Sequence, residues 1–191
     1  IIRKYPKNPV LITVPHSGSY YPELFKKYIK LNLDIIRKIE DYQSDKILKL
    51  VKKESADILI AKCSRAVVDL NRSRKSIDNN MFNEIVLFDY PDEKKMISYG
   101  LGVFPKIISN KSIFKIKLPI SYSRKMLERY YDPFQKSLYR QLEYILKKLD
   151  FVGGEDLIFF SDPDEIPRPK ILLNFHLQKN SAFRQISINF S

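Results

Sequence analysis

The sequence predicts an α/β fold, and three consecutive segments indicate it. Residues 9–14 form a short apolar run rich in β-branched residues that stops at a Pro-His-Ser-Gly turn, as expected for a buried strand followed by a loop. Residues 34–53 carry apolar side chains at roughly helical spacing behind Asp34, a potential N-terminal cap, and predict a helix. Residues 57–61 predict a second strand. A strand, helix, strand order favours layers of strands and helices.

The next two segments complete the first half of the predicted fold. Residues 66–70, AVVDL, are apolar and β-branched and predict a further short strand. Residues 73–122 contain Asn, Pro and Gly between short apolar groups, which predicts long loops with short strands.

The clearest amphipathic helix is predicted over residues 123–149, where apolar side chains recur every three or four positions. Asp132, Pro133 and Gln135 match the first positions of a capping box, so the proline either kinks this helix or begins its second half. Beyond it, two apolar runs at 157–160 and 171–175 predict strands on either side of a proline-rich loop.

Length and composition restrict the class of protein. A chain of 191 residues, 44% hydrophobic and 29% charged, suits one soluble globular domain spanning residues 1–191 and not a disordered chain. The single cysteine, Cys63, cannot form an internal disulfide, which favours the cytoplasm. No apolar run reaches 18 residues and no signal peptide is evident, so we expect no membrane association.

The charge favours an anionic partner without identifying it. Thirty-four Lys and Arg against 22 Asp and Glu give a net charge of +12, which attracts nucleic acid or small acidic molecules. The lysines are spread along the whole chain, and neither an RNP1 nor a GXXG motif is present. Nucleic-acid binding is therefore the least favoured hypothesis, and the oligomeric state stays open.

The strongest candidate for chemistry at the end of the first strand is His16. Ligands in open α/β sheets gather beyond the carboxyl ends of strands, and an imidazole there could bind a metal or exchange protons. Asp41 and Asp45 lie four apart on one face of the predicted helix and could hold a cation with His16. A loop histidine bonded to backbone and an ordinary charged helix face are the competing interpretations.

Residues 64–72, SRAVVDLNR, combine an apolar segment with Arg65 at one end and Asn71 and Arg72 at the other. Arginine binds carboxylates through two parallel hydrogen bonds, and an adjacent amide completes the binding of a small acid. Two arginines suit a substrate with two carboxylates. The alternative is a structural ion pair with Asp69.

These segments together resemble the N-formylglutamate amidohydrolases. The chain is similar to that family in the order of five motifs over roughly residues 8–149. The motifs are VPHSGSYYP around His16, Glu40-Asp41, SRAVVDLNR, Tyr99-Gly100-Leu101-Gly102 and Tyr130-Tyr131-Asp132-Pro133-Phe134-Gln135.

The resemblance implies a fold, a cofactor and a reaction. The fold would be a single three-layer domain with a central mixed β-sheet flanked by helices, similar to zinc carboxypeptidases and aspartoacylases. The reaction would be zinc-dependent hydrolysis of N-formylglutamate. By motif position His16 and Asp41 would bind the zinc, and Asn71 and Arg72 would bind a substrate carboxylate, with Arg65 a candidate for the other.

Three departures from the family pattern leave the catalytic residues unassigned. Gln135 stands where the family has histidine, and Ser187 stands nearest to the family's glutamate, the expected general base. The family's Asp-x-His-Ser, which supplies the third zinc ligand, is absent, its place falling near residues 149–151. His176, the only other histidine, is the candidate third ligand, and the alternative is an incidental surface or packing histidine. A different alignment of the short C-terminal tail, an altered enzyme and a chain that lacks residues are the explanations that stay open.

Two functions therefore lead. The first is hydrolysis of the amide of an N-acyl acidic amino acid by a zinc enzyme, supported by His16, Asp41 and the Asn71-Arg72 pair. The alternative is a degenerate relative that binds an acidic small molecule without turning it over, favoured by Gln135 and Ser187.

Overall fold

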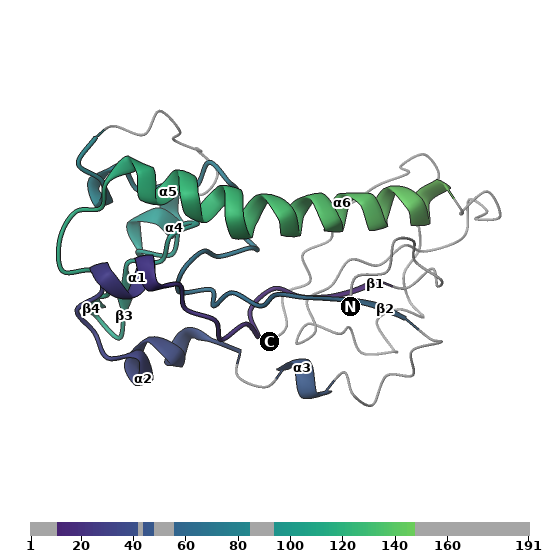
Figure 1. The fold of residues 1–191 in the computed structure, drawn as a ribbon, viewed down its shortest axis with the longest axis horizontal. Coiled ribbons are helices and arrows are strands. Elements are labelled where there is room, and N and C mark those ends of the chain that lie inside the picture. Colours follow the sequence, from purple (N-terminus) through teal and green to yellow (C-terminus); the bar gives the residue numbers. More distant parts are fainter. Residues whose placement is uncertain (1–10, 42–43, 48–55, 85–93, 148–191) are drawn as a thin grey trace.

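The computed structural model describes residues 11–41, 44–47, 56–84 and 94–147. Within them the chain forms a mixed α/β structure whose first two strands pair in parallel. Strand β1 (Leu11–Val14) lies beside β2 (Asp57–Ile60), with Leu11 opposite Asp57 and Val14 opposite Ile60 (Figure 1). The two strands predicted from residues 9–14 and 57–61 are confirmed in the part described.

A second small sheet is a hairpin of β3 (Ile107–Ile108) and β4 (Lys111–Ser112), paired antiparallel. Ser109 and Asn110 connect them with φ of 45° and 60°, the left-handed pair that a two-residue hairpin turn of type I′ needs. Most of the described chain between residues 73 and 119 is loop, as predicted, although α4 (Lys94–Ser98) was not foreseen.

The long helical rod in Figure 1 confirms the predicted amphipathic helix and begins three residues earlier than position 123. It consists of α5 (Ile120–Met126), a π-helical turn (Leu127–Tyr131) and α6 (Asp132–Lys147). The π-helical turn ends two residues before Pro133, which has no N–H to give to the helix.

The predicted capping box at Asp132 is wrong. Asp132 is itself helical, so the helix continues through it instead of restarting there. Its carboxylate binds Arg74, and the Gln135 side chain reaches a backbone carbonyl in another segment. Tertiary partners thus take both side chains that would have formed the cap.

The continuous helix predicted over residues 34–53 is also wrong. Helix α2 (Leu33–Ile36) and a 3-10 turn (Arg37–Ile39) end at Glu40, which is extended, and a separate helix α3 (Ser44–Ile47) follows. The N-cap is Asn32, whose side chain accepts from the Asp34 N–H, and not Asp34 itself. Tyr21 donates a hydrogen bond to the Glu40 carboxylate, and this buried contact holds the chain out of the helix.

Residues 66–70 are buried as expected but form no strand, and Ala66, Val67 and Leu70 lie in turns. The Ser64 carbonyl accepts from the Val67 N–H at 3.0 Å, and the Ser64 hydroxyl accepts from the Ala66 N–H at 3.2 Å. A serine that bonds the following backbone favours a turn over a sheet ladder.

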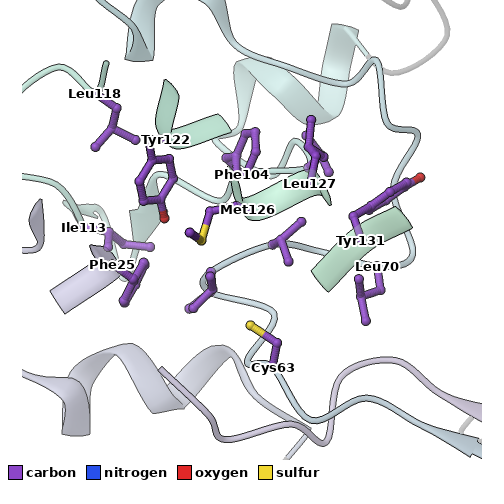
Figure 2. Close-up of a cluster of buried hydrophobic side chains, with 14 of the residues drawn as sticks. Phe25, Cys63, Leu70, Phe104, Ile113, Leu118, Tyr122, Met126, Leu127 and Tyr131 are labelled. Atoms are coloured by element: carbon purple, nitrogen blue, oxygen red, sulfur yellow. The ribbon is translucent and has the colours of Figure 1, made fainter. Parts of the chain in front are cut away.

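The hydrophobic core lies between the helical rod and the segments that follow β1 and β2. Tyr122 and Phe104 are fully buried and pack edge to face with their neighbours (Figure 2). Phe25 of α1 (Glu23–Tyr28) joins this cluster through Phe114, with ring centroids 5.8 Å apart. The core therefore connects α1, which follows the loop after β1, with α5 through packed aromatic side chains.

Several predictions fall outside the described residues. They are the strands at 157–160 and 171–175, the loop between them, His176 and Ser187. The three-layer arrangement, the single domain over 1–191 and the cytoplasmic location stay predictions. No helix in the described ranges has the length and apolar character that a membrane span needs.

Candidate functional site

The site begins where β1 ends. His16 follows the strand by two residues, and its side chain is 11% exposed. The loop crosses close to the chain that follows β2, because a Cβ on Gly18 would lie 2.2 Å from the Cys63 carbonyl oxygen. Only glycine permits this approach, which explains the glycine two positions after His16.

Asp41 reaches the same place because the preceding helix stops at Glu40. The Asp41 N–H donates to the His16 carbonyl at 3.3 Å, so the two backbones are in direct contact. Their side chains then meet, with His16 Nδ1 3.2 Å from Asp41 Oδ2. Asp41 remains 52% exposed at its side chain, so solvent reaches this edge of the site.

Asp69 lies at the centre of the site, although its side chain is only 2% exposed. One carboxylate oxygen accepts from His16 Nε2 at 2.9 Å and from the Asn71 N–H at 3.0 Å. The other accepts from the Arg65 guanidinium at 2.8 Å, and Arg72 Nε lies 4.0 Å away. A single buried carboxylate therefore joins the loop after β1 to both ends of the SRAVVDLNR segment.

These donors keep Asp69 ionised. Burial by itself would raise the pKa of Asp69, but the hydrogen bond from His16 and the positive charge of Arg65 outweigh it and lower the pKa to about 2. The three hydrogen-bond donors around this buried carboxylate replace the hydrogen bonds to water that it loses on burial.

The segment that carries Gly102 holds the backbone of Asp69. The Asp69 N–H donates to the Val103 carbonyl at 2.8 Å, and the Val103 N–H donates to the Ser76 carbonyl at 2.7 Å. A Cβ on Gly102 would lie 2.5 Å from the Ser76 carbonyl oxygen. The glycine at 102 thus allows the strand-like contact that positions Asp69.

The two arginines differ in how completely they are paired. Arg65 donates to Asp69 and has a second terminal nitrogen 3.9 Å from Asp41 Oδ1. Arg72 Nε is buried and has no hydrogen-bond partner among the residues that the structure describes. A buried donor without a partner is uncommon, but 24% of the Arg72 side chain is exposed, so solvent reaches another part of it. Asn71, next to it, is exposed.

The structure brings together most of the residues predicted from the sequence. His16, Asp41 and Arg65 meet around Asp69, and Arg72 lies at the edge of this group. Asp41 does not share a helix with Asp45, whose side chain, like all of His176, is outside the described residues.

The sequence pattern indicates Asp69 only as a structural ion-pair partner of arginine. That ion pair exists, but the same carboxylate also holds His16. A signal was available, since Asp69 is the one acidic residue between Arg65 and Asn71 in the most specific motif.

The donors at this edge of the site that could hold a metal ion are His16 Nδ1 and the Asp41 carboxylate. Asp69 takes the other ring nitrogen of His16, which leaves Nδ1 as the nitrogen that faces Asp41. Among the described residues no group of three His, Cys, Asp or Glu side chains is arranged as a metal site, so a third protein ligand would come from elsewhere.

Comparison with known proteins agrees with the sequence motifs. Residues 8–152 match the family model for N-formylglutamate amidohydrolase. The structure is similar to a crystal structure of N-formylglutamate amidohydrolase from Ralstonia eutropha JMP134, with a TM-score of 0.65 and 22% identity over 73% of this chain. The match spans 49% of that chain, about half its length. At this identity the likeness concerns the fold. Among curated proteins no sequence matches this chain.

Proposed function

Because the chain belongs to the N-formylglutamate amidohydrolase family, we propose that it hydrolyses the amide of an N-acyl acidic amino acid, with N-formylglutamate as the first candidate substrate. Water adds to the formyl carbon, the C–N bond breaks, and the nitrogen takes up a proton, so the products are formate and glutamate. The observation that carries the proposal is the cluster of His16, Asp41 and Arg65 around the buried Asp69.

Zinc is the proposed cofactor, and the donor pair fits it. An imidazole nitrogen and a carboxylate, such as those of His16 and Asp41, are ligand types that zinc takes in proteins. His176 is the candidate third ligand. A zinc ion held there would polarise the formyl carbonyl and make water a stronger nucleophile at neutral pH.

The arginines and Asn71 are the proposed contacts for the acidic substrate. The Arg72 side chain is 24% exposed, so the outer part of its guanidinium would bind a substrate carboxylate, and the neighbouring Asn71 amide would complete the binding. Arg65 is the candidate for a second carboxylate or for the carbonyl oxygen of the amide, because it lies between Asp69 and Asp41. These assignments make N-acyl amino acids with two carboxylates the preferred substrates.

No described residue is assigned as general base. Gln135 donates its side-chain amide to the Leu70 carbonyl at 2.7 Å, so it serves the backbone and exchanges no proton. This observation favours a second candidate function, in which the protein binds an acidic small molecule without hydrolysing it. The first candidate includes the three-layer fold, similar to zinc carboxypeptidases, that the family resemblance implies.

The deciding experiment measures zinc content and formate release on the full gene product, purified without chelator. We expect one zinc per chain, lost in His16→Ala, and hydrolysis of N-formylglutamate. Arg72→Met should raise KM for N-formylglutamate about tenfold or more, since it removes a charged hydrogen bond. Arg74→Met is the matched control, because Arg74 lies on the same segment but pairs with the exposed Asp132.

Each candidate function has its own outcome. Zinc-dependent formate release with an Arg72 effect and no Arg74 effect supports the amidohydrolase. Saturable binding of N-formylglutamate without formate release supports the non-catalytic relative. A protein without zinc that neither binds nor hydrolyses N-formylglutamate rejects both.

A further inference from the structure

In the described residues, the segment that presents Asn71 and Arg72 belongs to no strand, and residues 65–67 and 70–71 lie in turns. The Asp69 N–H donates to the Val103 carbonyl before this pair, and two side chains from the helical rod hold the chain around it. Tyr131 donates its hydroxyl to the Arg72 carbonyl at 2.7 Å, and Gln135 donates its amide to the Leu70 carbonyl at 2.7 Å. The two accepting carbonyls lie on either side of Asn71. The helical rod therefore holds the backbone both before and after this residue.

Both donors lie on one face of the rod, because residues four apart on a helix are neighbours. Tyr131 closes the π-helical turn Leu127–Tyr131, and Gln135 follows in the first turn of α6. In Figure 2 Tyr131 and Leu70 meet at one end of the core, where both side chains are buried. A single π-helical turn changes the direction in which the following residues point, and such turns are frequent at functional sites.

A third contact continues the attachment on the exposed side. Arg74 donates to both oxygens of Asp132, at 2.9 and 3.3 Å, so residues 70, 72 and 74 all bind the helix between 131 and 135. The Arg74–Asp132 pair is nearly half exposed and contributes little by itself. Tyr131 and Gln135 therefore carry the attachment.

We propose that Tyr131 and Gln135 are positioning residues that hold Asn71 and Arg72 in the arrangement that binds the substrate carboxylate. Neither would touch the substrate. The role accounts for glutamine at position 135, since a neutral amide donates to a backbone carbonyl at any pH, whereas a carboxylate would repel it. The link to substrate rests on the proposed function, but the attachment of residues 70–74 does not.

The first test measures that attachment without any substrate. Gln135→Met keeps the length of the side chain and removes the donor, and Tyr131→Phe removes the other donor. We expect amide hydrogen exchange in residues 70–74 to become about fivefold faster in each variant. Ser137→Ala is the matched control, because the Ser137 hydroxyl donates within α6 to the Pro133 carbonyl. It should leave exchange in residues 70–74 unchanged.

The second test asks whether the attachment acts through Arg72. Gln135→Met should raise KM for N-formylglutamate about fivefold while kcat stays within about twofold, and Ser137→Ala should change neither. When Arg72→Met is already present, Gln135→Met should have less than about a twofold further effect on KM, because the group that it positions is gone.

The outcomes separate the two proposals. Unchanged exchange in residues 70–74 overturns the positioning role, and so does a KM effect of Gln135→Met that persists in full beside Arg72→Met. A wild-type protein that neither binds nor hydrolyses N-formylglutamate overturns the proposed function instead, and hydrogen exchange alone then supports or rejects the attachment. If Gln135→Met does not fold, Tyr131→Phe provides the same comparisons.

Discussion

At the level of single residues, Asp69 shows how one carboxylate can order a site made from distant parts of the chain. It is almost completely buried, yet it binds His16, Arg65 and the backbone of Asn71. Because an Nε2–H of His16 is held by Asp69, the other ring nitrogen faces Asp41. The side chain that directs the proposed metal ligand is thus further from solvent than the ligand itself.

Asp69→Asn tests this role. The amide keeps the shape but lacks the charge that compensates Arg65, so we expect the free energy of unfolding to fall by about 3 kcal/mol and zinc affinity to fall about 10- to 100-fold. Urea denaturation and competition with a chelator measure the two effects.

Asp78→Asn is the control for Asp69→Asn. Asp78 is also a buried carboxylate, paired with Lys106 away from the site. This variant should lose stability but keep the zinc affinity of the wild type. Equal loss of zinc in both variants would mean that Asp69 acts only through stability.

Cys63 allows a prediction about alkaline pH. Burial raises the pKa of its thiol from 9.0 to about 12. A group with a raised folded pKa contributes stability below its unfolded pKa and loses it as pH rises through the folded value, so the loss falls between pH 9 and 12. Above pH 9 the wild type should lose up to about 1.4 kcal/mol per pH unit more than Cys63→Ala. Urea midpoints of both proteins at pH 8, 9 and 10, under reducing conditions, give this difference, and parallel curves would contradict it.

At the level of elements, hydrophobic periodicity predicted a helix correctly where one face of that helix packs against the core. It failed to predict where a helix ends when single hydrogen bonds between distant residues determine the end. The rod from α5 to α6 was predictable because its apolar face repeats over several turns. The interruption at Glu40 was not, because it depends on Tyr21 and on the backbone of His16, both distant in sequence. The same interruption is what brings Asp41 to the site.

The start of α2 offers a test at this scale. Asn32 caps the helix by accepting from the Asp34 N–H at 3.0 Å. Asn32→Ala should lower the free energy of unfolding by about 1 kcal/mol. Asp34→Asn, which breaks only an exposed 3.7 Å pair with Arg37, should change it by less than about 0.5 kcal/mol. Urea denaturation of both variants checks the prediction, and an equal effect would assign the stabilisation to charge instead of capping.

At the level of the whole molecule, one aromatic core joins the segments that carry the site. Tyr122 packs edge to face against Tyr28, Phe104 and Phe114 and is fully buried. Its hydroxyl has no hydrogen-bond partner in the described part of the chain, whereas the hydroxyl of Tyr131 binds the Arg72 carbonyl. The hydroxyl groups of these two buried tyrosines therefore contribute differently to the free energy of unfolding.

This difference predicts opposite signs for the same substitution. Tyr122→Phe removes a buried donor that lacks a partner and should raise the free energy of unfolding by about 1 kcal/mol. Tyr131→Phe removes a satisfied donor and leaves the Arg72 carbonyl without it, so it should lower the free energy by about 1 kcal/mol. Thermal or urea denaturation of the pair tests this, and a loss of stability in Tyr122→Phe would show that its hydroxyl is bonded.

The sequence by itself determined the α/β class, the first two strands, the long amphipathic helix and the family motifs, because these depend on local periodicity and on residue types in order. Only the tertiary structure decided that Asp69 is central, that Asp41 leaves its helix, and that Gln135 binds a backbone carbonyl. The physical reason is that each of these depends on hydrogen bonds between segments far apart in the chain. Such a bond leaves no periodic trace in the sequence, and it forms only after burial has brought the two segments together.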